Sequence, residues 1–256
     1  MAMSITNPTP ERGLSRASRG LAWLALTIGA VSATGALLAG PAYRMQWVSL
    51  ATGFLALRWA TYCAIAAAIA ATLALLLSTL LRAPRGRVAA GMALVASVLV
   101  AAPTLYLYNQ AQRVPKIHDI STDIDDPPLF VDVLPLRRGA RNPVDYKPET
   151  GALQKSGYPE IGPLVLDLPP ARALERAEAT ARAMGWRIVT VNRDALRVEA
   201  TDTTLLFGFK DDIVIRVRPK AQGSVVDVRS LSRIGGSDIG TNARRVRGFL
   251  KKLAAA

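Results

Sequence analysis

The sequence predicts a membrane-anchored α+β protein: about three N-terminal transmembrane helices, then a soluble domain whose antiparallel sheet is covered by two helices. Three observations predict this fold class. Of the 256 residues, 50% are hydrophobic, which is high for a soluble protein. The apolar residues gather in long uncharged runs within residues 21–109. Residues 163–256 instead carry short strand and helix patterns separated by polar turns.

The transmembrane region, residues 21–109, contains apolar runs at residues 21–39, 59–81 and 88–108. Each is long enough to cross about 30 Å of hydrocarbon at about 1.5 Å per residue. A cleaved signal peptide is the alternative for the first run. We favour a retained helix, because the run is longer than a signal core and further spans follow it.

The segment from Tyr43 to Arg58, between the first two runs, carries charge and aromatic residues. Extending the second span backward would bury Arg58 in hydrocarbon, which is costly unless the side chain reaches the interface. We therefore interpret the segment as interfacial, with Trp47 and Trp59 in the aromatic belt.

Positive charges beside the spans predict the orientation. They lie in an N-terminal tail, residues 1–20, and in the loop between the second and third spans: Arg12, Arg16 and Arg19, then Arg82, Arg85 and Arg87. With three spans both segments are on one side, and the positive-inside rule makes that side cytoplasmic. Everything after Tyr108 is then outside, which in a bacterial inner membrane means the periplasm.

Residues 110–162, here called the wrap segment, are rich in proline, which excludes long helices. The apolar run near Phe130 indicates an ordered segment wrapped on the domain, and we predict an edge strand at Leu129–Val133.

Residues 163–256 form the α+β core of the domain. A strand at Leu164–Leu168 precedes a helix that begins at Pro169-Pro170 and ends before Gly185. Antiparallel strands and a last helix, capped by Ser237 or Asp238, then follow. The strands are predicted at residues 186–191, 195–201, 205–209, 213–218 and 225–233, with Lys210-Asp211-Asp212 as a hairpin turn.

Composition excludes several classes of site. Cys63 is the only cysteine and lies in an apolar run, so an intrachain disulfide and a cysteine metal site are excluded. His118 is the only histidine and has no nucleophile motif around it, which excludes a catalytic triad. About half of the net charge of +13 lies in residues 1–110, where arginines flank the spans, and the domain is expected outside the cytoplasm, so we expect no nucleic-acid partner. We also expect no cofactor.

Three separated segments resemble the domain-of-unknown-function family 1499. They are IHDISTDIDDPPLF (117–130), LFGFKDDIVIRVRP (206–219) and VDVRSLSRIGGSDIGTNARRVRGFL (226–250), in the order expected for the family. The resemblance covers about residues 112–252. It implies a small bacterial envelope or membrane protein, with relatives in photosynthetic organisms, and it implies no established activity.

The first candidate site is the loop that follows His118. His118, Asp119 and Asp123 are the candidates for catalysis, and Asp123, Asp125 and Asp126 are the candidates for a hard cation such as Ca²⁺. The loop lacks the glycine and the distal glutamate of an EF-hand. We favour aspartates that form turns before Pro127-Pro128, so no metal is assigned.

Two basic groups are candidates for binding an anion, such as a lipid head group or a polyanionic glycan. One lies on two neighbouring strands: Arg216, Arg229, Ser230 and Arg233. Here cross-strand pairing with Asp227 is the simpler interpretation. The other surrounds the start of the last helix after Gly235-Gly236: Ser237, Asn242 and Arg245. An ordinary capped helix with a basic face is the simpler interpretation there.

We therefore expect a membrane-anchored envelope protein whose periplasmic domain binds or scaffolds without catalysis. Its expected partners are the lipid bilayer, an anionic envelope ligand or other membrane proteins. The alternative is a hydrolase or metal-assisted enzyme built around His118 and the neighbouring aspartates.

Overall fold

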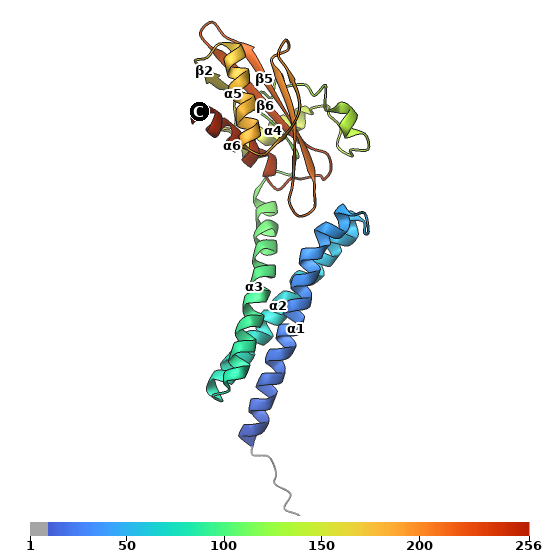
Figure 1. Cartoon of the computed structure of the whole chain (residues 1–256), viewed down its shortest axis with the longest axis vertical. Helices are drawn as coiled ribbons and strands as arrows, with labels where there is room; N and C mark the ends of the chain where they lie inside the picture. Colours follow the sequence, from blue (N-terminus) through green and yellow to red (C-terminus); the bar gives the residue numbers. More distant parts are fainter. Residues whose placement is uncertain (1–9, 256) are drawn as a thin grey trace, which may run out of the picture. The chain divides into compact units, whose positions relative to one another are not determined.

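The computed structural model describes residues 10–255, with side chains from residue 13 onward, and the chain divides into two compact units after Tyr108 (Figure 1). The first unit consists of three helices, each long and apolar enough to cross a membrane. They are α1 (Pro10–Arg44), α2 (Leu50–Leu80) and α3 (Pro84–Arg113). Of the predicted N-terminal tail, residues 1–9 and the side chain of Arg12 lie outside the described part of the chain.

The three helices pack against one another through alanine. Each layer of buried contacts takes small side chains from all three, such as Ala25, Ala71 and Ala93, which are fully buried. A similar layer combines Ala22 with Ala74. Small residues let helix backbones approach closely in a bilayer, where lipid offers no hydrophobic drive for association. The larger apolar side chains therefore face outward.

The segment from Tyr43 to Arg58 includes the turn between α1 and α2. The hydroxyl of Ser49 accepts the backbone N–H of Thr52 at 3.1 Å and caps α2 at its start. At about 1.5 Å per residue, Arg58 lies roughly 12 Å along a helix of roughly 46 Å, which exceeds the hydrocarbon thickness. The helix can therefore hold a full span after Arg58, so the interfacial position of this segment stays a prediction.

The second unit is a six-stranded antiparallel sheet in the order β1-β6-β5-β4-β3. β2 pairs with the N-terminal part of β6, on the same side as β1. The strands are β1 (Asp119–Ser121), β2 (Leu164–Leu166), β3 (Arg187–Asn192), β4 (Arg197–Thr203), β5 (Lys210–Pro219) and β6 (Ser224–Ser232). β6 is central, because it pairs with β5 along one side and with β1 and β2 along the other.

Two helices cover one face of the sheet, as predicted (Figure 1). They are α5 (Pro170–Ala183) and α6 (Thr241–Ala255). Alternate strand residues such as Val198 and Ala200 point into this core, which also contains Trp186 stacked on Phe249 with ring centroids 5.3 Å apart. This α+β arrangement confirms the predicted fold class.

The middle of the wrap segment lies against the opposite face of the sheet, whereas Ile117, Tyr158 and Ile161 near its ends belong to the helix-covered core. The segment contributes β1, a short 3₁₀ helix η1 (Leu134–Arg137) and α4 (Pro148–Gly157). Phe130 and Val133 pack on Val214 of β5 and Leu231 of β6. The predicted edge strand at Leu129–Val133 was wrong: the segment has no strand there, because its backbone donors bond to a side chain of the sheet, as described below.

Two further predictions in the sheet were wrong. The predicted strand at Leu205–Phe209 is a loop, which the backbone N–H of Thr204 closes by donating to the carbonyl of Phe209 at 2.8 Å. Lys210-Asp211-Asp212 is no hairpin turn and instead begins β5, where both aspartates are buried. Apolar residues usually indicate a strand and aspartates a turn, but here the loop is apolar and the strand begins with two aspartates. Both predictions failed for this reason.

Candidate functional site

The face of the sheet that the wrap segment covers carries many charged side chains. Because side chains alternate along a strand, the residues opposite the apolar core share this face. They include three buried carboxylates and four arginines: Glu199, Asp212, Asp227, Arg216, Arg218, Arg229 and Arg233. The wrap segment adds Asp119, Asp123, Asp126 and Arg137. The charges are therefore brought together from residues far apart in the sequence.

Glu199 binds the backbone of the wrap segment. Its side chain is fully buried, with Oε1 accepting the N–H of Val131 at 2.9 Å and Oε2 accepting the N–H of Val133 at 2.8 Å. The two donors occupy alternate positions, as they would if they faced a neighbouring strand. A charged acceptor strengthens such bonds and satisfies donors that water cannot reach.

Asp119 and Arg229 form a buried, two-pronged ion pair between β1 and β6. Arg229 Nε lies 3.0 Å from Oδ1 of Asp119, and Nη2 lies 2.7 Å from Oδ2. The guanidinium also donates to the carbonyl of Val144 at 2.6 Å and lies over the rings of Phe130 and Tyr146. Burial raises the pKa of Asp119, and Arg229 opposes that shift. Removing either partner would leave a buried charge uncompensated.

Asp212 holds a second buried charge cluster. Its Oδ2 accepts Nη1 of Arg137 at 2.6 Å and Nε of Arg233 at 2.8 Å, while its Oδ1 accepts the hydroxyl of Thr201 at 2.7 Å. Burial lowers the pKa of Arg137, and the charge of Asp212 counteracts this. Two arginines sharing one carboxylate fix η1 of the wrap segment onto β5 and β6.

The third cluster lies nearer the surface and contains the predicted cross-strand pair. Arg216 is directly opposite Asp227, and Arg218 Nε lies 2.8 Å from Oδ2 of the same aspartate. Asp123 lies 3.3 Å from Arg216 and 3.0 Å from Arg218, and Asp126 lies 2.8 Å from Arg216. Three carboxylates therefore neutralise two guanidinium groups. These neighbours raise the pKa of Arg218, with the hydrogen bond to Asp227 as the main cause.

A separate polar cluster surrounds the start of α6, on the helix-covered face. The carboxylate of Asp238 accepts the N–H of Gly240 and of Asn242, each at 2.8 Å, so the helix N-terminus already holds an anionic group. Arg245 pairs with Asp202 at 2.8 Å and with Asp211 at 2.7 Å, and it also contacts Asn242. Burial raises the pKa of Asp238, and the two backbone donors oppose this.

The structure separates the predicted site residues into these clusters. Ser230 points away from Arg229 and donates to Asn242 at 2.7 Å, beside Arg245. Ser237 lies in the loop before α6 and accepts the N–H of Ile239 at 3.3 Å. The sequence grouped Ser230 with Arg216, but the structure places these two residues on opposite faces of the sheet. Ser230 instead lies with Asn242 and Arg245.

The loop after His118 has a structural arrangement. Asp123 Oδ1 accepts the backbone N–H of Asp126 at 2.9 Å, which is the predicted aspartate turn. Within the described residues, no three His, Cys, Asp or Glu side chains are grouped to hold a metal, and Asp125 joins none of the ion pairs above. His118 accepts the N–H of Ser232 through its carbonyl, while its buried Nδ1 has no hydrogen-bond partner within the described part of the chain.

Five contributors were missed at the sequence level: Glu199, Asp212, Arg137, Asp202 and Asp211. The alternation of residues 195–201 placed Glu199 opposite the core face, and this was a usable signal. What it did not reveal was that a second layer buries this face.

Residues 119–253 match the model of a family described as a protein of unknown function, DUF1499. The match spans every strand of the sheet and both covering helices, and it includes the charge clusters described above. No curated protein matches the chain.

Proposed function

Because this chain belongs to the DUF1499 family, whose description assigns no activity, we propose its function from its own contacts: it is a membrane-anchored protein of the bacterial cell envelope with a non-catalytic binding or scaffolding domain. The three helices anchor it in the inner membrane, and the domain of residues 109–256 lies in the periplasm. Its partners are envelope proteins bound through the wrap segment.

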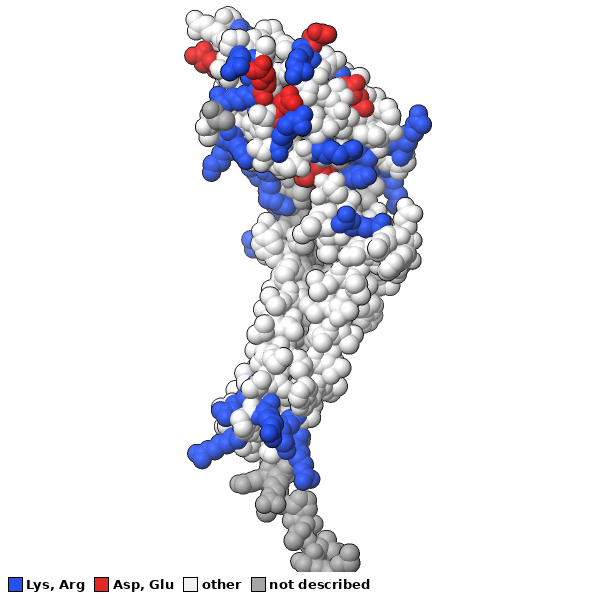
Figure 2. Space-filling model, in the orientation of Figure 1, with Lys and Arg blue, Asp and Glu red and all other residues white. Residues whose placement is uncertain are grey.

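The arrangement of basic residues supports the orientation. Arg19 of α1 lines the same groove as Arg82 of the α2–α3 turn and Arg85 of the first turn of α3, so the two predicted basic segments lie at one end of the helical unit. Figure 2 shows Lys and Arg side chains gathered at that end, with a long uncharged stretch beyond it. Positive charges of this kind are retained in the cytoplasm. An odd number of spans then brings the domain to the other side.

The observation that carries the non-catalytic proposal is the pairing of charges. Arg216, Arg229 and Arg233 are each bound to an aspartate of the same domain. An anionic ligand would have to displace those carboxylates. Likewise, general acid–base catalysis needs a group within reach of substrate, whereas Asp119 and Glu199 are both buried between the wrap segment and the sheet. These groups stabilise one conformation of the domain.

One observation favours the alternative of a hydrolase. The Nδ1 atom of His118 is buried without a hydrogen-bond partner within the described residues, and unexplained polar atoms of this kind occur at functional sites. Against this, the adjacent Asp119 is committed to Arg229 and Asp123 is committed to Arg216 and Arg218. A histidine without an available carboxylate supports the enzyme less well.

The wrap segment offers a surface for a protein partner. Four of its apolar side chains are 41–72% exposed: Leu129, Val131, Leu134 and Leu136. Their neighbours Phe130 and Val133 are buried, so the segment is held rigidly beneath them. Clustered apolar residues on a fixed backbone are typical of a protein interface.

Site-specific photo-crosslinking in intact cells tests the proposal. A photoreactive residue at Leu129 or Leu134 should give a discrete protein adduct, whereas the same residue at Arg172, which is 71% exposed on α5, should not. The adduct should persist in a His118→Gln background, because the interaction needs no acid–base group. Equal labelling at all three positions contradicts the interface. Failure of His118→Gln, at normal protein level, to complement a strain lacking the protein supports the enzyme instead.

A further inference from the structure

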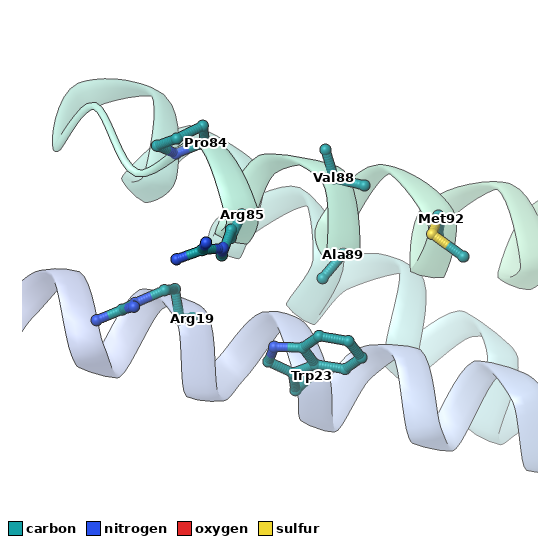
Figure 3. Close-up of a pocket in the computed structure, with 7 residues that line it drawn as sticks. All are labelled: Arg19, Trp23, Pro84, Arg85, Val88, Ala89 and Met92. Atoms are coloured by element: carbon teal, nitrogen blue, oxygen red, sulfur yellow. The ribbon is translucent and has the colours of Figure 1, made fainter.

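A groove opens on the helical unit between α1 and α3, at the basic end of the bundle (Figure 3). Arg19 and Trp23, one helical turn apart on α1, form one wall. The other wall is one face of α3, where the lining residues lie three, four and seven positions after Arg85. The lining residues are Arg19, Trp23, Pro84, Arg85, Val88, Ala89 and Met92, around a volume of about 410 Å³. The groove therefore has two guanidinium groups at one end and an apolar remainder.

Within residues 13–108, no acidic side chain balances the charge of the two arginines. Between residues 13 and 108 the sequence contains no aspartate or glutamate, so neither arginine has a carboxylate partner within the described part of this unit. Arg19 donates through Nε to the carbonyl of Ser15 at 3.1 Å, which leaves its two terminal nitrogens available. In Figure 3 both side chains extend toward the same end of the groove, away from Met92. This contrasts with the arginine clusters of the sheet, which are all neutralised by aspartates.

The apolar part of the groove continues directly from the two charges. Trp23, Val88 and Met92 are 57–65% exposed, and buried Ala89 forms the floor. From Arg85 to Met92 the groove follows α3 for roughly 10 Å, enough for a glycerol backbone and the first carbons of an acyl chain. Trp23 lies one turn from Arg19, and tryptophan is enriched where a membrane changes from head groups to hydrocarbon.

We propose that this groove binds an anionic phospholipid of the membrane leaflet in which the basic end lies. The head-group phosphate bridges Arg19 and Arg85, and one acyl chain lies along Trp23, Val88 and Met92. Guanidinium groups suit phosphate because they present several donors in a fixed plane. A soluble phosphate would use the charges alone, whereas the lipid also covers the apolar wall. The proposal concerns the helical unit only and does not depend on the function of the domain.

Quenching of Trp23 by brominated lipids tests the proposal on the full chain in lipid nanodiscs. With Trp47, Trp59 and Trp186 replaced by phenylalanine, Trp23 is the only tryptophan. In a phosphatidylcholine background, brominated phosphatidylglycerol should quench Trp23 at roughly 25-fold lower mole fraction than brominated phosphatidylcholine, because both arginines contribute. Each juxtamembrane arginine adds about fivefold to affinity for anionic lipid. Arg19→Gln and Arg85→Gln should therefore each reduce the preference by about that factor.

Arg58→Gln is the matched control, since it removes the same charge from an exposed position on α2 outside the groove, and it should leave the preference unchanged. Arg19→Lys and Arg85→Lys should retain most of it, which separates loss of charge from loss of folding. Equal quenching by both lipids would overturn the proposal. So would loss of the preference when millimolar inorganic phosphate is added, because the groove would then bind a free anion.

Discussion

The carboxylate of Glu199 on β4 accepts the backbone N–H of Val133 at 2.8 Å, across a separation of 66 residues. With the matching bond to Val131, it takes the place of a neighbouring strand for this part of the wrap segment. The apolar run at Leu129–Val133 therefore forms no strand, because a side chain accepts its alternate backbone donors in place of a neighbouring strand. One side chain thus decides both the conformation of the segment and its position on the sheet.

Replacing Glu199 should destabilise the domain strongly. Glu199→Ala removes two charge-assisted hydrogen bonds and leaves the part-buried N–H of Val131 and the buried N–H of Val133 without an acceptor, so we expect a loss of roughly 3 kcal/mol in the free energy of unfolding. Urea unfolding followed by tryptophan fluorescence measures it. The control is Glu175→Ala, which breaks an exposed pair with Arg172 and should change stability by less than about 0.5 kcal/mol. Similar losses for the two variants would show that Glu199 does not hold the segment.

The domain should fold without the membrane helices. Residues 111–256 contain a complete apolar core between the sheet, α5 and α6, and the second face is covered by the fragment's own wrap segment. We expect the fragment to unfold in one cooperative thermal transition, with Trp186 as its only tryptophan and therefore a specific probe. An insoluble or molten fragment would indicate that α1–α3 complete the core.

Fusions to alkaline phosphatase should report the orientation. The enzyme is active only after export, so a fusion after Tyr108 should be active and a fusion after Arg85 inactive. The physical reason is the retention of the arginines at one end of the helical unit in the cytoplasm. Immunoblots must show equal levels of both fusions. The reverse pattern would place the domain in the cytoplasm.

Divalent cations should not stabilise the domain. Asp123 is engaged in a turn with Asp126 and in ion pairs with Arg216 and Arg218, so its oxygens are already satisfied. We expect equal melting temperatures with chelator and with millimolar Ca²⁺, Mg²⁺ or Zn²⁺. Asp123→Ala should lower stability by about 0.5–2 kcal/mol under both conditions, the range for losing a capping side chain.

A bound ion would behave differently, because stabilisation by a ligand grows with its free concentration. A rise in melting temperature with one ion, erased by Asp123→Ala or Asp125→Ala, would establish a metal site in this loop.

Asp238 should make the domain less stable as pH rises. Burial raises the pKa of this carboxyl above its ordinary value of 3.8, so the folded state binds a proton more tightly than the unfolded state. Its contribution to stability is therefore complete below that value and is lost as pH rises through the folded pKa. Asp238→Asn does not titrate, and it keeps an oxygen acceptor for one of the two backbone donors, because Gly240 and Asn242 donate to different oxygens of Asp238. The free energy of unfolding of this variant, minus that of the wild type, should increase as pH rises from about 4 through the folded pKa of Asp238. A constant difference would contradict the shift.

The sequence predicted the elements whose patterns are local. Three long apolar helices and the alternation of Val198 and Ala200 with Glu199 follow from periodicity alone. The failures share a cause: Leu129–Val133 and Lys210-Asp211-Asp212 take their structure from distant partners. A buried aspartate such as Asp212 looks like a turn residue until Arg137, 75 positions earlier, is seen to neutralise it. Long-range charge pairing leaves no periodic signal, so the charge clusters could not be assembled from sequence.

The ion pair between Asp119 and Arg229 also has a consequence for biosynthesis. The two residues are 110 positions apart, and the aspartate emerges from the ribosome first. At about 5–20 residues per second, roughly 5 to 20 s pass before its partner is made. Throughout that interval the wrap segment has no sheet to bind, because β6 is the last strand synthesised. The nascent domain therefore cannot complete its fold stepwise from the N-terminus, and it remains open to proteases and chaperones until β6 has been synthesised.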